Sequence, residues 1–232
     1  MNLESNRAPW ARFWPLALVA GLAFMALVTA PRVSRSDAAK TQTSRLQNAP
    51  VPQGMAVATL SGGCFWSMEA IYKRLSGVKS TTPGYAGGKV ANPTYEQVGS
   101  GATGHAESLN IVYDPKVISY ADLVEVLLTV LDPTTPNQQG ADTGTNYRSI
   151  IFYRNANEQK IAQDVIGKIN AKHLWKAPIV TQVVPIKTFY RAEDYHQNYY
   201  DTHQSAGYCQ AVIVPKLDKL RAKFAARLKN QS

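Results

Sequence analysis

The residue best suited to chemistry in this sequence is Cys64, one of two cysteines among 232 residues. It lies in the stretch SGGCFWSMEA, directly after two glycines and at the start of a predicted helix that ends near Gly77. Backbone N–H groups at a helix N-terminus favour a negative charge, so we expect the pKa of this thiol to lie below its ordinary value of about 8.5. Its position alone leaves an inert thiol, half of a structural disulfide and a nucleophile open.

Metal and phosphate binding find little support in the sequence. The two cysteines are far apart, and no pair among the four histidines has the spacing of a zinc site. The stretch GYAGGK lacks both the P-loop pattern and the dinucleotide-binding pattern. A cysteine–histidine hydrolase remains open, because it requires only that a histidine lies near Cys64 in space.

Charge and composition narrow the class of protein. The net charge is +9, and residues 1–50 hold six basic and two acidic residues. No cluster of Arg and Lys is interleaved with aromatic residues, so we do not expect nucleic-acid binding. Hydrophobic residues make up 45% of the chain and charged residues 18%, which is typical of a folded globular protein.

The N-terminal segment 13–30, FWPLALVAGLAFMALVTA, carries no charge and follows two arginines. This pattern is typical of a secretory signal peptide or of an uncleaved membrane anchor. We therefore expect residues 1–30 to direct export to the periplasmic side, where disulfides can persist. Residues 31–54 are rich in polar residues, alanine and proline and indicate a flexible linker, which places the folded domain at 55–229.

Strands and helices alternate along this domain. Strands are expected at 56–60, 109–113, 148–154 and 181–187, and helices at 64–77, 119–131, 155–169 and 216–228. The region 76–107 is rich in Gly, Thr and Pro and is expected to be a long functional loop. The alternation predicts a two-layer α/β sandwich.

Six motifs occur in a fixed order along the domain. They are GCFWSMEA (63–70), GYAGG (84–88), TGHAE (103–107), GADTGTNYRS (140–149), EDYHQNYY (193–200) and GYC (207–209). Together they resemble the A-type peptide methionine sulfoxide reductases, which reduce the S epimer, over about residues 55–220. The resemblance implies an α/β (α+β) fold with a mixed sheet and packed helices, ferredoxin-like, with long functional loops.

The resemblance assigns catalytic roles to three residues. Cys64 matches the nucleophile, Glu107 matches the acid that donates a proton to the sulfoxide oxygen, and Cys209 matches the resolving cysteine. Sulfoxide reduction requires this set, because a thiolate attacks sulfur and oxygen leaves only when it is protonated. Burial among aromatic side chains would raise the pKa of Glu107 and keep it protonated. Cys209 would then convert the sulfenic acid of Cys64 to a disulfide.

The resemblance also assigns a substrate pocket. Its members are Phe65 and Trp66 as an apolar wall for the S-methyl group, Tyr85 and Tyr147 as phenols that bond the oxygen, and Asp142 as a polar neighbour. No bound cofactor or metal is implied. The implied partners are proteins or peptides that contain methionine sulfoxide and a thioredoxin-like or small-thiol reductant, with a membrane-relayed donor outside the cytoplasm. The enzyme is expected to be a monomer.

Some positions depart from the family pattern. Ser67 stands where Gly is usual, and Leu131 and Ala141 stand where His and Asn are common. No cysteine follows Cys209, which excludes a second disulfide relay within the chain. His105 is expected to be a structural hydrogen-bonding residue, and His196 is expected to orient the loop near Cys209.

Two alternatives stay open at this point. A thiol peroxidase would also pass through a sulfenic acid, but it needs an Arg and a Thr close to the cysteine, and the stretch SGGCFWS has neither. A membrane-tethered binding domain would instead hold Cys64 and Cys209 in a permanent disulfide.

Overall fold

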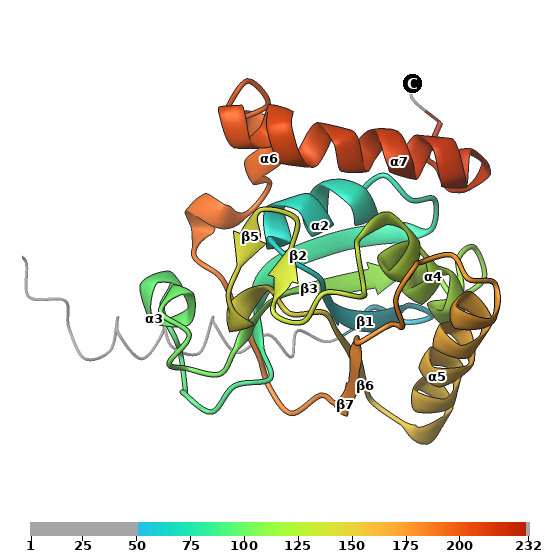
Figure 1. Ribbon diagram of the computed structural model, residues 1–232, viewed down its shortest axis with the longest axis horizontal. Helices are drawn as coiled ribbons and strands as arrows, with labels where there is room; N and C mark the ends of the chain where they lie inside the picture. Colours follow the sequence, from blue (N-terminus) through green and yellow to red (C-terminus); the bar gives the residue numbers. More distant parts are fainter. Residues whose placement is uncertain (1–50, 231–232) are drawn as a thin grey trace, which may run out of the picture. The chain divides into compact units, whose positions relative to one another are not determined.

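A six-stranded sheet in the order β7-β6-β1-β3-β2-β8 lies at the centre of the protein in a computed structural model, which describes residues 51–230 (Figure 1). The strands are β1 (Ala56–Ser61), β2 (Val78–Ala86), β3 (Ala106–Tyr113), β6 (Ile150–Tyr153), β7 (Gln182–Pro185) and β8 (Phe189–Arg191). A separate short hairpin consists of β4 (Gln138–Gln139) and β5 (Asp142–Thr143). The predicted leader and most of the predicted linker lie outside the described residues.

Helices follow most strands, as the sequence predicts. They are α2 (Phe65–Tyr72), α3 (Tyr95–Gly99), α4 (Tyr120–Val130), α5 (Ala156–Ala171), α6 (Tyr199–Thr202) and α7 (Val214–Phe224). Single turns lie at η1 (Thr145–Tyr147), η2 (Asp194–His196) and η4 (Ala225–Arg227), and a π-helical turn, η3 (Cys209–Ile213), leads into α7. Within residues 51–230, none of these helices has the length and apolar character needed to span a membrane.

The strand order identifies the fold. β1, α2 and β2 form a split βαβ unit in which β3 lies between the two strands and pairs antiparallel with both. β6 pairs antiparallel with the other side of β1, which gives the ferredoxin-like order β6-β1-β3-β2. β7 pairs in parallel with β6 and is an edge strand, which explains how it accommodates Pro185. The predicted α/β fold is confirmed.

The main core lies between this sheet and helices α2, α4 and α7, which contribute fully buried aliphatic side chains to it. α7 runs beside α2 in Figure 1. The helix starts that the sequence predicts are present: Ser119 and Asp122 form a reciprocal capping box, and the Asn155 side chain accepts the backbone N–H of Glu158. These caps fix where α4 and α5 begin.

The prediction of a loop over 76–107 is wrong for much of its length. β2 occupies the first part and α3 forms further along. Pro83 and Gly84 lie inside β2, where the Pro83 carbonyl accepts the N–H of Ala192 at 3.0 Å. A Cβ at Gly84 would lie 2.3 Å from the ring of Phe189. Gly84 is therefore required by the close approach of β2 to β8, although the Gly, Thr and Pro content of this region indicates a loop.

Candidate active site

The turn before α2 presents Cys64 at the end of β1. Gly63 has φ of 85°, and a Cβ there would come within 2.5 Å of the Gln139 side chain. The Gly63 N–H donates to the carbonyl of Tyr147 at 3.1 Å, which ties the η1 turn to the same junction. Cys64 is the N-cap residue of α2 and is 6% exposed. The predicted strand-turn-helix junction is confirmed.

The environment of the Cys64 thiol differs from the expectation. Burial raises the pKa of Cys64 well above its ordinary value, and the negative charge of Glu107 raises it further. Hydrogen bonds from the Tyr208 hydroxyl and the backbone N–H of Trp66 act in the opposite direction but do not outweigh burial. The prediction of a lowered thiol pKa is therefore wrong for this closed site, because desolvation exceeds the effect of the helix N-terminus.

Glu107 on β3 lies against the same helix N-terminus. Its Oε2 accepts the backbone N–H of Phe65 at 3.0 Å, and its side chain is 1% exposed. Burial raises the pKa of Glu107 to about 8, helped by the charge of Asp142 and opposed by the hydrogen bond from Phe65. A protonated carboxyl group therefore lies beside the thiol at neutral pH, as the sequence predicts.

Two tyrosines approach this carboxyl group from different elements. Tyr85 on β2 is paired with Glu107 on the neighbouring strand β3. Tyr147 in η1 packs against the cluster that contains Cys64 and Tyr85. The Tyr85 hydroxyl donates to Glu193 Oε2 at 2.8 Å, and Glu193 also accepts the N–H of Tyr95. Burial raises the pKa of Tyr147 to about 12, with the charges of Glu107 and Cys64 adding to the effect. Tyr147 therefore stays protonated and can act as a donor, whereas the single O–H of Tyr85 is already donated to Glu193.

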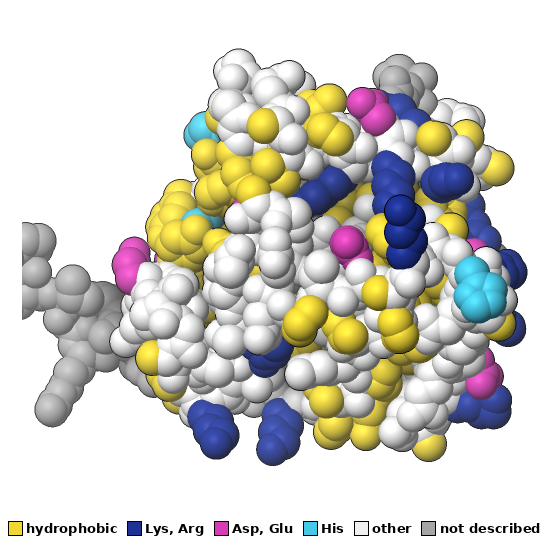
Figure 2. Space-filling model, in the orientation of Figure 1, with side chains coloured by type: hydrophobic (Ala, Val, Ile, Leu, Met, Phe, Trp, Pro, Cys, Tyr) yellow, Lys and Arg dark blue, Asp and Glu magenta, His cyan; other side chains and the backbone are white. Residues whose placement is uncertain are grey.

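Aromatic rings form one wall of the site. Phe65 is fully buried, and its ring centroid lies 5.9 Å from that of Tyr85 and 5.0 Å from that of His196. Trp66 is half-buried, stacks on Tyr199 at 3.7 Å, and donates its indole N–H to His196 Nδ1 at 3.1 Å. On the face in Figure 2, hydrophobic side chains gather between α3 and α6, with histidine among them.

The polar end of the site is closed by a pair of residues. The Tyr208 hydroxyl donates to Asp142 Oδ2 at 2.8 Å and also interacts with the Cys64 sulfur. All predicted site residues except Cys209 therefore meet at one place: a nucleophilic sulfur, a neutral acid, phenol donors and an apolar wall. Among residues 51–230, no group of three His, Cys, Asp or Glu side chains is placed to hold a metal ion.

The family model for "Peptide methionine sulfoxide reductase" matches residues 56–228. The chain belongs to the peptide methionine sulfoxide reductase family.

Individual relatives agree with this assignment. The reductase MsrA of Polynucleobacter asymbioticus is 50% identical over 174 residues, covering 75% of this chain and 92% of the relative. MsrA of Sulfolobus acidocaldarius is 52% identical over 170 residues, covering 73% and 96%. Reduced Mxr1 from Saccharomyces cerevisiae superposes with a TM-score of 0.62 at 35% identity, covering 68% of this chain and 91% of that one. The chain is thus an oxidoreductase that reduces methionine sulfoxide in peptides by thiol chemistry, a repair reaction.

Cys209 occupies a different place in this reductase. It is fully buried in the main core beside α2 and α7, and both cysteines are free thiols. Burial raises the pKa of Cys209. The adjacent Tyr208 packs against both the main core and the side chains around Cys64. The binding-domain alternative requires a permanent disulfide, which this state does not contain.

The sequence analysis missed three residues of the site. Tyr208 precedes Cys209 in the motif GYC, and Glu193 begins EDYHQNYY, so both stood inside motifs without an assigned role. Tyr95 lies in the region expected to be loop. His196 accepts the indole N–H of Trp66 at 3.1 Å, and its role in orienting the loop near Cys209 stays a prediction. His105 is structural as predicted, because it accepts the N–H of Gly88 at 3.0 Å.

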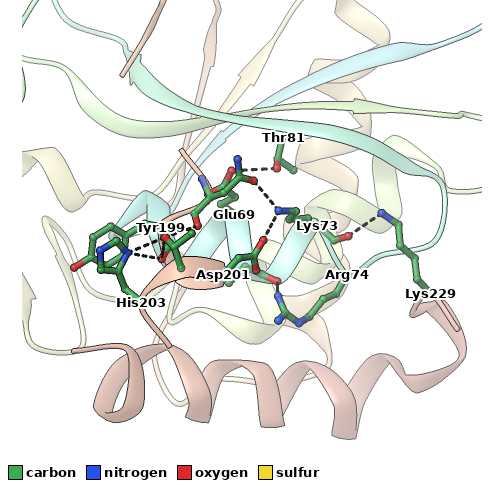
Figure 3. Close-up of polar contacts among 11 residues, drawn as sticks. Glu69, Lys73, Arg74, Thr81, Tyr199, Asp201, His203 and Lys229 are labelled. Carbon is green, nitrogen blue, oxygen red and sulfur yellow. Dashed lines mark hydrogen bonds and ion pairs between the residues drawn. The ribbon is translucent and has the colours of Figure 1, made fainter. Parts of the chain in front are cut away.

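A polar network holds the catalytic helix α2 against α6 (Figure 3). Glu69 is 3% exposed, and its Oε2 accepts the N–H of Asn198 at 2.8 Å. Lys73 donates to Asn198 Oδ1 at 2.6 Å and forms an ion pair with Asp201. Burial raises the pKa of Glu69 to about 7, although Asn198 and Lys73 act to lower it.

This buried carboxyl group should make stability depend on pH. The ordinary pKa of Glu69 is 4.5 and the folded value is about 7, so the folded state holds more protons than the unfolded state between these values. The free energy of unfolding should therefore contain a contribution that is lost as pH rises through this window. In Glu69→Gln this contribution is absent, and urea unfolding at about pH 5 and about pH 8 should show a shallower pH dependence. Glu125→Gln, a more exposed carboxylate on α4, is the control and should follow the wild type. An unchanged slope in Glu69→Gln would contradict this assignment.

Proposed function

We propose that this enzyme reduces the S epimer of peptide methionine sulfoxide through a sulfenic acid on Cys64. The sulfur of Cys64 attacks the sulfoxide sulfur and forms an S–S bond to the substrate. The oxygen takes up a proton and moves to the Cys64 sulfur as its bond to the substrate sulfur breaks. The S–S bond then breaks, which releases methionine and leaves Cys64 as the sulfenic acid. The observation that supports this most strongly is the protonated Glu107 carboxyl group bonded to the Phe65 N–H, directly beside Cys64. Such an acid lowers the barrier to oxygen departure.

The raised pKa of the Cys64 thiol is compatible with this chemistry if the bound sulfoxide takes part in the proton transfer. In the closed site the thiol keeps its proton, so both Cys64 and Glu107 carry one at neutral pH. The sulfoxide oxygen is a strong acceptor that can take hydrogen bonds from Glu107 and Tyr147, and from Tyr85 when its hydroxyl turns away from Glu193. Donors aimed at a developing oxyanion are worth about 2.7–4 kcal/mol each in comparable sites.

We propose that Cys209 then resolves the intermediate. Its thiol attacks the sulfenic sulfur, water leaves, and a Cys64–Cys209 disulfide forms. Because Cys209 starts in the main core, the segment that carries it must rearrange first. The π-helical turn at Cys209–Ile213 provides an irregular, weaker helix start at the required position. A thioredoxin-like dithiol would reopen the disulfide by exchange, since no third cysteine exists in the chain.

Single cysteine substitutions test this sequence of steps. Cys64→Ser should reduce turnover of a peptide S-sulfoxide to the uncatalysed level, because no other side chain supplies the nucleophile. Cys209→Ser should release one methionine per enzyme and then stop when a thioredoxin-type donor is the reductant, with the sulfenic acid trapped by dimedone and detected by mass. Full activity in Cys64→Ser would overturn the proposal. Multiple turnovers in Cys209→Ser would remove Cys209 from the resolving role.

The acid role of Glu107 has its own test. The protonated form is the active one, so the single-turnover rate should fall as pH rises through about 8, where Glu107 loses its proton. Glu107→Gln should lower the rate by about 10²-fold or more and remove this limb of the profile. Asp122→Asn, a carboxylate in the capping box of α4, is a control that should keep the limb. A wild-type limb that survives in Glu107→Gln would exclude the acid role.

We also propose that the enzyme is exported. The uncharged 18-residue stretch at 13–30 after two arginines supports either a cleaved signal or an anchor in the inner membrane. In a bacterial host, protease added to spheroplasts should digest the reductase domain, and N-terminal sequencing of the membrane-free fraction should show whether cleavage occurs. Protection of the intact chain in spheroplasts, with digestion only after lysis, would overturn the proposal.

A further inference from the structure

The unusual Ser67 of the motif GCFWS makes a specific contact. It lies on α2, one turn after Cys64, and is fully buried. Lys216 Nζ, from the first turn of α7, donates to Ser67 Oγ at 3.2 Å. A lysine ammonium is thus held against the helix that presents the nucleophile.

The charges around this ammonium are few. Within residues 51–230, no carboxylate forms an ion pair with Lys216, unlike Lys73, which pairs with Asp201. Burial lowers the pKa of Lys216, whereas negative charge on Cys64 and Asp142 raises it. Cys64 and Asp142 are therefore the anionic groups that interact with its ammonium. Partial burial of a charged lysine without a carboxylate partner costs free energy, which suggests that its charge serves a function.

A positive charge near Cys64 would stabilise its thiolate. Two acidic groups near the sulfur oppose ionisation of Cys64: Asp142, and Glu107 once it has lost its proton. The hydrogen bonds that Tyr208 and the Trp66 backbone make with Cys64 counteract this effect, and neither partner carries a charge. The Lys216 ammonium is bonded at Ser67, one helical turn from Cys64, and interacts with the charge of Cys64. It changes this balance, because opposite charges attract strongly where water is excluded.

We propose that Lys216, oriented by Ser67, is a positioning residue whose ammonium stabilises the Cys64 thiolate. The inference rests on the proposed role of Cys64. The charge serves the cycle twice: when the sulfur attacks the sulfoxide, and when Cys64 leaves as a thiolate from its disulfide with Cys209. Ser67 supplies the acceptor that glycine at the same position would lack, so the departure from the family pattern and the lysine form one functional unit.

The test measures thiolate formation without requiring turnover. In the full chain with Cys209→Ser, Cys64 is the sole cysteine, and iodoacetamide alkylation between about pH 7 and pH 10 reports its ionisation. Lys216→Met should slow alkylation about tenfold at each pH, displacing the profile upward by about one pH unit. Lys216→Arg should restore most of the rate. Ser67→Ala should give a smaller displacement in the same direction.

A matched control lies on the same helix. Lys219→Met removes another partly buried lysine, which sits over the Trp175 ring at 4.4 Å, and should leave the profile unchanged. An unmoved profile in Lys216→Met overturns the inference, and if thermal melting shows that this variant is unfolded, Ser67→Ala decides instead. Single-turnover reduction of a peptide sulfoxide by the Cys209→Ser protein is run in parallel. A displaced profile with no reduction in any variant would contradict the reductase mechanism and leave the electrostatic role intact.

Discussion

The hydrogen bond between the Phe65 N–H and the Glu107 carboxyl group is the contact on which the site depends. It joins the first residue of α2 to the middle of the sheet, and so fixes the sulfur of Cys64 beside the acid. The same contact lowers the pKa of Glu107, while burial raises it to about 8. A weaker burial would leave an ionised carboxylate that cannot donate a proton. The close packing of Phe65 and Tyr85 is therefore needed for Glu107 to act as an acid, because this packing excludes the water that would stabilise the ionised carboxylate.

That closure has an opposite effect on the nucleophile. The sulfur needs to ionise, yet the surroundings that keep Glu107 neutral also keep the thiol neutral. A neutral Glu107 and an ionised Cys64 can coexist only if some contacts stabilise the thiolate without also stabilising the carboxylate. Tyr208 does so because it interacts with the sulfur while its hydroxyl donates to Asp142, and the α2 N-terminus does so through the backbone N–H of Trp66. The ammonium of Lys216 belongs to the same set of contacts, since it approaches α2 at Ser67, away from Glu107's partner Phe65.

Sequence reasoning reached the fold and most of the site for physical reasons. Helix caps such as Ser119–Asp122 act over a few residues and can be read directly. The motifs placed Cys64, Glu107, Tyr85 and Tyr147, which meet as expected. The pKa of Cys64 could not be predicted, because it depends on burial by β2, β3 and η1 together. β2 was missed since Pro83 and Gly84 indicate a turn, whereas neighbouring strands determine their conformation. The Tyr208–Asp142 bond joins positions 66 residues apart, which no local pattern encodes.

Cys209 and Cys64 lie in two different packed regions of the domain. The Cys209 thiol is buried in the main core, outside the cluster of side chains around Cys64. Tyr208 packs against both regions and bonds Asp142, which couples the arrangement of the Cys209 segment to the polar end of the site. Glu69 and Lys73 hold the preceding segment at Asn198 to the catalytic helix. The proposed movement of Cys209 toward Cys64 would then take place between α6 and α7, while α2 stays held to Asn198 through Glu69 and Lys73.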